Sequence, residues 1–271
     1  MKILNGQDLA GYIKERQAKQ VRMLRQAHGI YPKLAIVTDT DNPVIETYMR
    51  LKKHYGEDIL IDVEIFRTNP DDVMSIIDEL NVRQDIQGVI VQLPISDMSR
   101  ADEILGRVSP SKDVDGLSPQ TVFDAATPTA INWLLSGHSV ELSGKKIAII
   151  GRGRLVGAPL EKMWRASELD VEVFEKGDDL SHLQQFDVIV TAAGAPHTIM
   201  NNMVKPGAVL VDAGTAVEDG RVRGDVDEQV RKRQDISITP EKGGVGPLTV
   251  TALFDNVINA CLKIANIKDK D

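Results

Sequence analysis

Short runs of valine, isoleucine and leucine recur along the chain and alternate with longer segments in which apolar residues have helical spacing. The runs lie at 34–37, 59–66, 89–93, 146–150, 171–174, 187–191, 208–211 and 236–238. Continuous apolar runs of this length are typical of parallel strands that are covered on both faces. Their alternation with helices predicts an α/β fold.

Turn-forming residues gather between residues 113 and 143, where Asp-Val-Asp-Gly, Ser-Pro, Thr-Pro and Ser-Gly occur. This chemistry is expected where one sheet ends and another begins, and 271 residues suffice for two domains of ordinary size. We therefore place a domain boundary in this segment. Residues 247–264 have the apolar spacing of a last helix, and we expect the charged tail 268–271 to fray.

Composition narrows the classes of function. The chain has 32 basic and 40 acidic residues, and a net charge of −8 disfavours the positive surface of a nucleic-acid-binding protein. Its single cysteine, Cys261, can form no intramolecular disulfide. We see no signal peptide and no run approaching the roughly 20 apolar residues of a membrane-spanning helix. These features predict a soluble, cytoplasmic protein without nucleic-acid or membrane partners.

A helix is predicted from residue 42 to residue 56. Asn42 can cap its first turn, Pro43 suits the first helical position, and Gly56 is expected to close it. Within this helix an apolar stripe is formed by Val44, Tyr48, Leu51 and Tyr55.

Lys52 lies four residues after Tyr48 and therefore beside this stripe. A partly desolvated lysine has a lowered pKa and can transfer protons. More often, however, a lysine beside an apolar stripe extends its charged end to solvent, and a tyrosine within the stripe belongs to the core. The helix by itself favours this second interpretation.

Two polar residues are ambiguous in the same way. Gln92 ends the apolar strand of Gly88-Val-Ile-Val-Gln-Leu-Pro94, where it could satisfy backbone groups or contact a ligand, because open α/β sheets bind ligands at strand ends. Asp115, in Asp113-Val-Asp-Gly116, could form a turn or bind a ligand.

A glycine-rich loop follows the apolar strand 146–150 and precedes a helical pattern at 160–166. Gly151, Gly153 and Gly157 give the spacing Gly-x-Gly-x-x-x-Gly, one residue longer than the usual dinucleotide fingerprint. A glycine turn before a helix N-terminus nevertheless suits a pyrophosphate. A purely structural turn is the alternative.

The residues after the next strand leave the choice of dinucleotide open. Glu175 would favour the ribose 2′-hydroxyl of NAD, whereas Lys176 and Arg152 would favour the 2′-phosphate of NADP. Two further strands end in small residues that would let a cofactor approach the backbone, at Ala193 and Gly194 and at Gly214 and Thr215.

Taken together, these motifs resemble those of the bifunctional methylenetetrahydrofolate dehydrogenase/methenyltetrahydrofolate cyclohydrolase family. Five segments carry the resemblance, in the family's order: Tyr48-x-x-x-Lys52, Val91-Gln-Leu-Pro94, Lys112-Asp-Val-Asp-Gly116, the loop 151–159, and Gly243-Gly-Val-Gly-Pro-Leu-Thr249. The resemblance implies an N-terminal α/β folate domain (1–122), a Rossmann-like dinucleotide domain (123–247), and a C-terminal helix (248–271) that returns to the first domain.

The resemblance also implies roles for individual residues. Lys52 would be the catalytic lysine, Gln92 its hydrogen-bond partner, Tyr48 the ring beside the folate and Asp115 the pterin-binding carboxylate. The folate site would also include Gly243, Gly244 and Pro247. The dinucleotide site would comprise Gly151, Arg152, Gly153, Gly157, Glu175, Lys176, Ala193, Gly194, Gly214 and Thr215.

The implied activity is that of a cytoplasmic homodimer in one-carbon metabolism, which supplies purine biosynthesis. It oxidises 5,10-methylenetetrahydrofolate to the 5,10-methenyl form with NADP, the family's usual cofactor, and hydrolyses the product to 10-formyltetrahydrofolate. NAD is a serious rival, since Lys176 beside Glu175 replaces the family's 2′-phosphate serine. Further departures from the family pattern are Ile45, Gly153, Ala126 and Glu241-Lys242.

Two other functions compete with this one. The chain could be a dehydrogenase without cyclohydrolase activity, although Lys52 and Gln92 argue against it. It could instead be a non-catalytic protein that senses folate or a nucleotide. We expect no metal site, because the five histidines lack ligand spacing: His28, His54, His138, His182 and His197.

Overall fold

The computed structural model describes residues 2–218 and 221–265. The chain divides into two compact units, which we name by their sheets. The six-stranded unit takes in residues 1–10 and 127–249, and the three-stranded unit takes in residues 11–126 and 250–271. The tail 268–271, which we expected to fray, lies outside the described residues.

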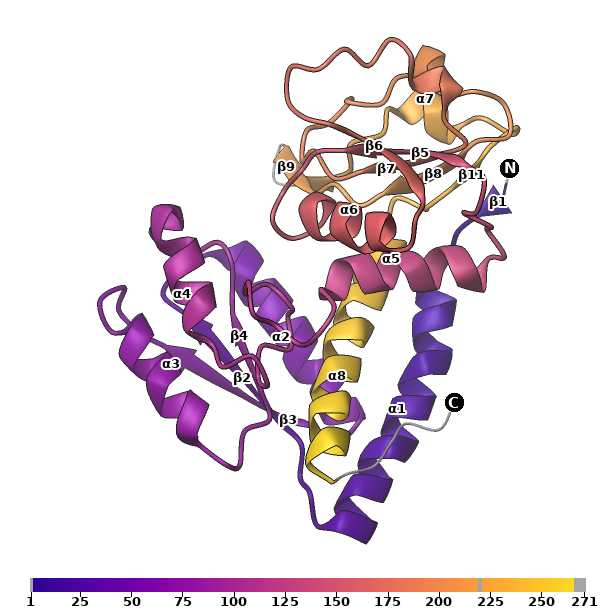
Figure 1. The fold of residues 1–271 in the computed structure, drawn as a ribbon. Helices are drawn as coiled ribbons and strands as arrows, with labels where there is room; N and C mark the ends of the chain where they lie inside the picture. Colours follow the sequence, from indigo (N-terminus) through magenta and orange to yellow (C-terminus); the bar gives the residue numbers. More distant parts are fainter. Residues whose placement is uncertain (1, 219–220, 266–271) are drawn as a thin grey trace. The chain divides into compact units, whose positions relative to one another are not determined.

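The three-stranded unit is built on a parallel sheet in the order β3-β2-β4. Its strands are β2 (Lys33–Thr38), β3 (Asp62–Arg67) and β4 (Gly88–Val91), and its helices are α1 (Gly6–His28), α2 (Pro43–Asp58), α3 (Val73–Val82), η1 (Met98–Arg100), α4 (Ala101–Arg107) and α8 (Val245–Ile264). Helices α3 and α4 cover one face of this sheet, and α2 and α8 lie on the other side (Figure 1).

A buried polar group joins the helices α1, α2 and α8. The amide of Gln17 donates to the carbonyl of Thr251 (2.9 Å) and to the carboxylate of Asp255 (3.0 Å), and it accepts a hydrogen bond from the hydroxyl of Tyr55 (2.7 Å). The Tyr55 ring stacks on Phe254 with 5.1 Å between centroids. Burial raises the pKa of Tyr55 to about 12, so its hydroxyl remains a donor at neutral pH.

The predicted start of α2 is confirmed, but its predicted end is wrong. Asn42 caps the helix, with its side chain accepting from the N–H of Val44 at 2.8 Å. Gly56 lies inside the helix and is buried. A side chain there would come within 2.7 Å of the Ile61 carbonyl oxygen, so close packing explains the glycine at this position. The left-handed conformation expected at a helix end occurs at Leu60 instead, with φ of 65°.

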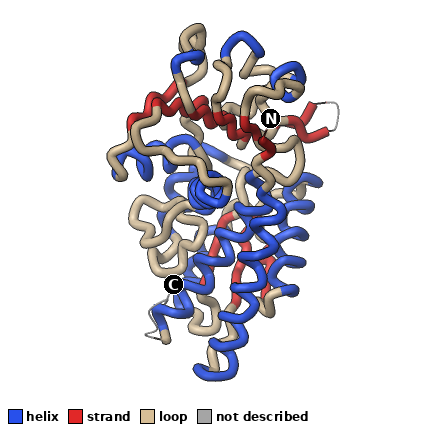
Figure 2. The backbone as a smooth tube through the Cα atoms, turned by 90° about the vertical axis from the view of Figure 1, so that its right-hand side faces the viewer, coloured by secondary structure: helices blue, strands red, loops and turns tan. Residues whose placement is uncertain are grey.

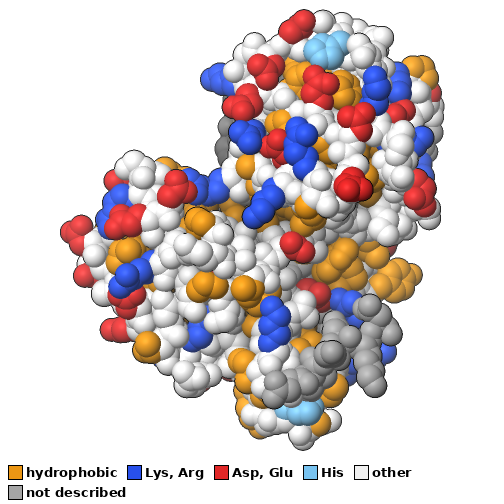
Figure 3. Space-filling model, viewed as in Figure 1, with side chains coloured by type: hydrophobic (Ala, Val, Ile, Leu, Met, Phe, Trp, Pro, Cys, Tyr) orange, Lys and Arg blue, Asp and Glu red, His pale blue; other side chains and the backbone are white. Residues whose placement is uncertain are grey.

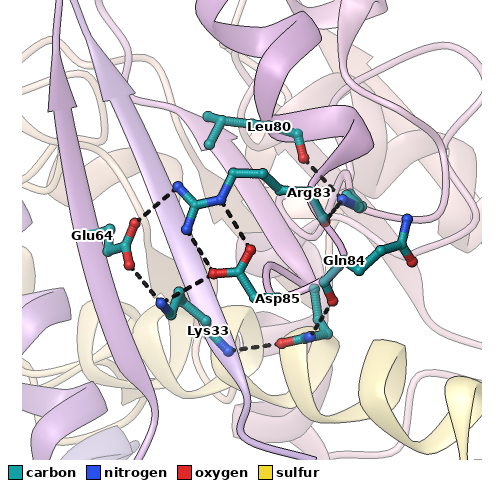
Figure 4. A network of polar contacts seen from close by, with 8 residues as sticks. Lys33, Glu64, Leu80, Arg83, Gln84 and Asp85 are labelled. Atoms are coloured by element: carbon teal, nitrogen blue, oxygen red, sulfur yellow. Dashed lines mark hydrogen bonds and ion pairs between the residues drawn. The ribbon is translucent and has the colours of Figure 1, made fainter.

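An ion-pair network surrounds the amino ends of β2 and β3 (Figure 4). Lys33 pairs with Glu64 at 2.6 Å, and Arg83 pairs with Asp85 at 2.6 Å. Lys112 donates to the Leu80 and Arg83 carbonyls, at 2.9 and 2.5 Å, at the C-terminal end of α3. Within the motif that contains Asp115, Lys112 therefore has a structural role.

The six-stranded unit contains a parallel sheet in the order β1-β11-β8-β7-β5-β6. Its strands are β1 (Lys2–Ile3), β5 (Lys146–Ile150), β6 (Asp170–Phe174), β7 (Val188–Thr191), β8 (Val209–Asp212) and β11 (Ser237–Ile238). The hairpin β9 (Ala216–Glu218) and β10 (Arg221–Arg223) stands apart from this sheet.

Helices lie on both sides of the six-stranded sheet. Helices α5 (Ala126–Gly137) and α6 (Gly157–Ala166) cover one face, and α7 (Glu228–Arg231) lies over the other (Figures 1 and 2). The short helices η2 (Leu183–Gln185) and η3 (Asn201–Met203) lie in the connections. The Trp164 indole donates to the Asn132 side chain at 2.7 Å and so ties α6 to α5. The α/β fold is confirmed, and a strand occurs in each of the eight predicted runs, although that of 59–66 begins only at Asp62, after Leu60 has ended the turn that follows α2.

Two expectations about the helices need correction. Helix α5 lies within the segment that we expected to consist of turns, where Pro128 occupies its first turn. Among the described helices, α8 alone has the length and apolar character of a membrane span, contrary to our expectation of none. Because 61% of its most apolar window is buried inside the fold, the pattern is that of a core helix.

Candidate active site

The structure brings Lys52 and Gln92 together. Lys52 projects from α2, and its Nζ donates to Oε1 of Gln92 at 2.8 Å. Gln92 follows β4 directly, where its backbone N–H donates to the Val37 carbonyl at 2.8 Å and only 9% of the residue is exposed. Its side-chain Nε2 donates to the Leu93 carbonyl at 2.9 Å. The amide oxygen is therefore turned toward the lysine.

Burial changes the acid–base properties of this site. Loss of water lowers the pKa of the Lys52 amine, an effect that the charge of Asp115 opposes. Loss of water likewise raises the pKa of Asp115, opposed by the charge of Lys52. The amine consequently gives up its proton at lower pH than an ordinary lysine does, as proton transfer at neutral pH requires.

The two aspartates of Asp113-Val-Asp-Gly116 have different roles. Asp113 is 3% exposed, and its carboxylate accepts from the Ser118 N–H at 2.8 Å, so it forms the turn. No hydrogen bond from the described part of the chain reaches the carboxylate of Asp115. Asp115 is thus the one of the pair that is available to a ligand.

The exposed side of α2 differs from our expectation. Tyr48 is 37% exposed, and Val44 and Leu51 beside it are 38% and 50% exposed, so the interpretation of Tyr48 as a core residue is wrong. Of the four residues of the stripe, only Tyr55 packs inside the fold, against Phe254. The buried side is formed by Ile45 and Met49 instead. Ile45, one of the departures from the family pattern, is 2% exposed within the core. An exposed tyrosine ring one turn before the lysine suits a planar ligand.

Two of the three glycines in the loop after β5 are fixed by packing. Gly151 has φ of 93°, and a side chain there would lie 2.6 Å from the Ala192 carbonyl oxygen. A side chain on Gly157 would lie 1.8 Å from the carbonyl oxygen of Gly151, whereas Gly153 has nothing within 4 Å. Helix α6 starts at Gly157 without a side-chain cap, and its positive end faces the loop, although the N–H of Ala158 donates to the Gly153 carbonyl at 3.1 Å and Pro159 has no N–H.

Charges of both signs meet beside this loop. The Nε of Arg152 donates to the Glu161 carboxylate at 2.8 Å, and its Nη1 lies 3.8 Å from that of Glu175. These carboxylates raise the pKa of Arg152 and keep its charge fixed. Lys176 is exposed next to Glu175. The end of β6 therefore offers both acidic and basic partners to a ribose.

The remaining predicted residues lie on loops of the six-stranded unit. The Gly243 carbonyl accepts from the N–H groups of Gly6 (2.8 Å) and Gln7 (3.0 Å), and a side chain on Gly6 would lie 2.0 Å from the Gly244 carbonyl oxygen. Pro247 lies in the first turn of α8. The loop after β7 contains Ala193 and Gly194, and the loop after β8 contains Gly214 and Thr215. Of these residues, Ala193, Gly194 and Thr215 are exposed.

Sequence reasoning missed two buried aspartates, Asp212 and Asp225, that support these loops. Asp225 lies in Gly224-Asp-Val-Asp-Glu228, where clustered acidic residues are typical of a solvated turn and do not indicate a buried carboxylate. The only signal was the position of Asp212 at the end of a predicted strand. Across the described ranges 2–218 and 221–265, no group of three or more His, Cys, Asp or Glu residues is arranged to hold a metal ion.

Comparison with known families decides the identity of the chain. Residues 4–115 match the model of the tetrahydrofolate dehydrogenase/cyclohydrolase catalytic domain, and residues 125–265 match the model of its NAD(P)-binding domain. The chain belongs to the tetrahydrofolate dehydrogenase/cyclohydrolase family. The resemblance seen in the sequence, the expected enzyme class and the binding of NAD(P) are thereby confirmed.

Individual relatives agree over nearly the whole chain. The bifunctional protein FolD of Halothermothrix orenii is 33% identical over 276 residues, covering 96% of this chain and 97% of the relative. The crystal structure of the bifunctional FolD methylenetetrahydrofolate dehydrogenase/cyclohydrolase of Campylobacter jejuni is similar, with a TM-score of 0.91 and 33% sequence identity. The match covers 97% of this chain and 99% of that one. The crystal structure of the Trypanosoma brucei FolD enzyme, complexed with NADP and an inhibitor, has a TM-score of 0.91 and 25% sequence identity. The match covers 97% of this chain and 98% of that one.

The glycine loop allows a matched test. Gly157→Ala places a β-carbon against the Gly151 carbonyl, so the loop must move, and we expect the dissociation constant for NAD(P)H to rise at least about tenfold, or about 1.4 kcal/mol. Gly106→Ala, at a glycine of α4 outside this loop where a side chain also meets open space, should change it by less than about threefold. Fluorescence titration with NADPH and NADH measures both, and equal effects of the two substitutions would contradict the packing argument.

Proposed function

We propose that this enzyme oxidises 5,10-methylenetetrahydrofolate to the 5,10-methenyl form with NADP and hydrolyses that product to 10-formyltetrahydrofolate. The observation that carries the proposal is the desolvated amine of Lys52, hydrogen-bonded to Gln92 at 2.8 Å, in a chain of this family. We assign the folate site to the three-stranded unit and the dinucleotide site to the six-stranded unit. The boundaries 1–122, 123–247 and 248–271 remain our proposed domain limits.

The oxidation requires little acid–base chemistry from the protein. NADP, when bound, accepts the hydride from the carbon that bridges the two folate nitrogens. Those nitrogens stabilise the resulting cation, and no proton has to leave. The contribution of the chain is to position the folate, for which we assign the exposed ring of Tyr48 and the carboxylate of Asp115.

The hydrolysis requires proton transfer, which we assign to Lys52. Water adds to the methenyl carbon and loses a proton, which leaves a neutral carbinolamine. The bond from this carbon to one nitrogen then breaks, that nitrogen gains a proton, and the hydroxyl loses its proton to solvent as it becomes the formyl oxygen, so one proton is released overall. A neutral amine can accept the first proton and donate the second. Burial favours the neutral form of Lys52, and Gln92 orients it without adding charge.

Lys52 and Gln92 also distinguish the proposed bifunctional enzyme from the main alternative. A dehydrogenase without cyclohydrolase activity needs no lysine with a lowered pKa, because hydride transfer moves no proton. The preserved hydrogen bond between Lys52 and Gln92 therefore favours the bifunctional enzyme.

We propose NADP as the cofactor, held by the loop from Gly151 to Gly157 and by the small residues after β7 and β8. The related enzyme of Trypanosoma brucei has been crystallised with NADP. Arg152 and Lys176 supply positive charge for a 2′-phosphate, whereas Glu175 opposes it.

We further propose that the enzyme is a cytoplasmic homodimer without nucleic-acid or membrane partners. On the face drawn in Figure 3, basic and acidic side chains are interspersed over each unit, as on the surface of a protein that binds neither. Light scattering tests the assembly, since a dimer has twice the 29.8 kDa of one chain.

Substitution of Lys52 tests the proton transfer. Lys52→Met keeps the length of the side chain but removes the amine, so we expect methenyltetrahydrofolate hydrolysis to fall about 10²- to 10⁴-fold while NADP reduction continues. Lys53→Met, at the exposed neighbouring position, should leave both rates unchanged. Because the neutral amine is the active form, the wild-type hydrolysis rate should rise with pH through a pKa below the ordinary lysine value. Undiminished hydrolysis in Lys52→Met would refute this role.

The choice of cofactor is tested by two substitutions next to the ribose site. Arg152→Ala should raise the KM for NADP about tenfold and change the KM for NAD little, because only NADP carries the 2′-phosphate. Glu175→Gln should lower the KM for NADP, since it removes a negative charge. A wild-type enzyme that strongly prefers NAD would contradict the proposal and would assign the ribose hydroxyl to Glu175.

A further inference from the structure

The loops at the carboxyl edge of the six-stranded sheet rest on two buried aspartates. Asp225 follows β10 and is fully buried, and Asp212 ends β8 with 3% of its side chain exposed. Ala193, Gly194 and Ala195, in the loop that these aspartates support, are exposed residues. This loop is therefore supported from the protein side and open on the other.

Asp225 makes three hydrogen bonds to that single loop. Its Oδ2 accepts from the Thr191 hydroxyl and from the Ala193 N–H, both at 2.7 Å, and its Oδ1 accepts from the Ala195 N–H at 2.8 Å. A carboxylate only accepts hydrogen bonds, so both of its oxygens match these donors. The conformation of the loop, in which Gly194 has φ of 65°, is thus fixed by one side chain.

Asp212 in turn holds Asp225 in place. Its carboxylate accepts from the backbone N–H groups of Asp225 (3.1 Å) and Val226 (3.2 Å). The guanidinium of Arg231 pairs with Asp212, and its Nη1 also donates to the Thr239 carbonyl at 3.1 Å. These contacts leave Asp225 little freedom to follow a displaced loop.

Two glycines make room for the aspartates. A side chain on Gly214 would lie 2.1 Å from the carboxyl carbon of Asp225, and one on Gly224 would lie 2.0 Å from a carboxylate oxygen of Asp212. We had explained the small residue at 214 by close approach of a cofactor. The structure shows that a carboxylate of the protein fills this space.

We propose that Asp225 is a positioning residue for the dinucleotide, because it fixes the backbone from Ala193 to Ala195 at the edge where open α/β sheets bind ligands. The inference rests on the proposed function. It extends that function to a residue that contacts the loop from its buried side and is separate from the glycine-rich motif.

Asp225→Asn tests the inference with little change of shape. The new NH2 group faces either the Ala195 N–H or the donors of Thr191 and Ala193, so part of the support is lost. We expect the KM for NADP to rise at least about tenfold and the dehydrogenase kcat to fall. Hydrolysis of methenyltetrahydrofolate without nucleotide, which depends on Lys52, should stay within about twofold. Asp235→Asn, an exposed ion-pair partner in the same unit, is the control and should change neither activity.

The outcomes separate positioning from general stability. A folded Asp225→Asn enzyme with an unchanged KM for NADP, or a parallel loss of both activities, would overturn the inference. Should Asp225→Asn fail to fold, Thr191→Val removes one donor only and should raise the KM for NADP about threefold, and an unchanged KM would overturn the inference. A wild-type protein that oxidises methylenetetrahydrofolate with neither nucleotide would instead refute the proposed function.

Discussion

Parallel strand pairing is the constraint on which both units depend. Parallel strands need a crossover between each pair, and their carboxyl ends meet at one edge of the sheet. In the three-stranded unit this places Gln92 at the end of β4, within reach of the helix that follows β2. In the six-stranded unit it gathers the loops after β5, β6, β7 and β8. We therefore place the proposed chemistry of each unit at one edge of its sheet.

The two units place charged groups away from water in different ways. Asp225 has donors for both carboxylate oxygens, so its charge is satisfied and it makes the surrounding backbone rigid. Lys52 is partly buried and, within the described part of the chain, hydrogen-bonds one side chain, the neutral amide of Gln92, while Asp115 attracts it through its charge. Because the hydrogen-bonding capacity of the charged Lys52 amine is only partly used, the amine loses its proton more easily. Rigidity and reactivity thus follow from how many partners a buried charge has.

The sequence predicted the features that depend on local patterns. Strands appeared as apolar runs, and the cap of α2 appeared as Asn42 before Pro43. Features set by contacts between distant residues were not predictable in this way. Hydrophobic spacing could not tell which face of α2 is buried, so the helix by itself favoured Tyr48 as a core residue, whereas Ile45 is the buried one. Only the family resemblance placed Tyr48 beside the folate. Gly56 looked like a helix end because only the packed structure shows the Ile61 carbonyl beside it. Asp225 was missed for the same reason.

The first strand has a consequence for the order of folding. β1 pairs with β11, and the Gly243 carbonyl binds the N–H groups of Gly6 and Gln7, so the start of the chain is joined to residues near its end. Contacts of such long sequence separation form late, because nearly the whole chain must be closed into a loop before they can contribute. On the ribosome, Lys2 and Ile3 emerge long before their partners. The edge of the six-stranded sheet is therefore completed only after synthesis has passed β11.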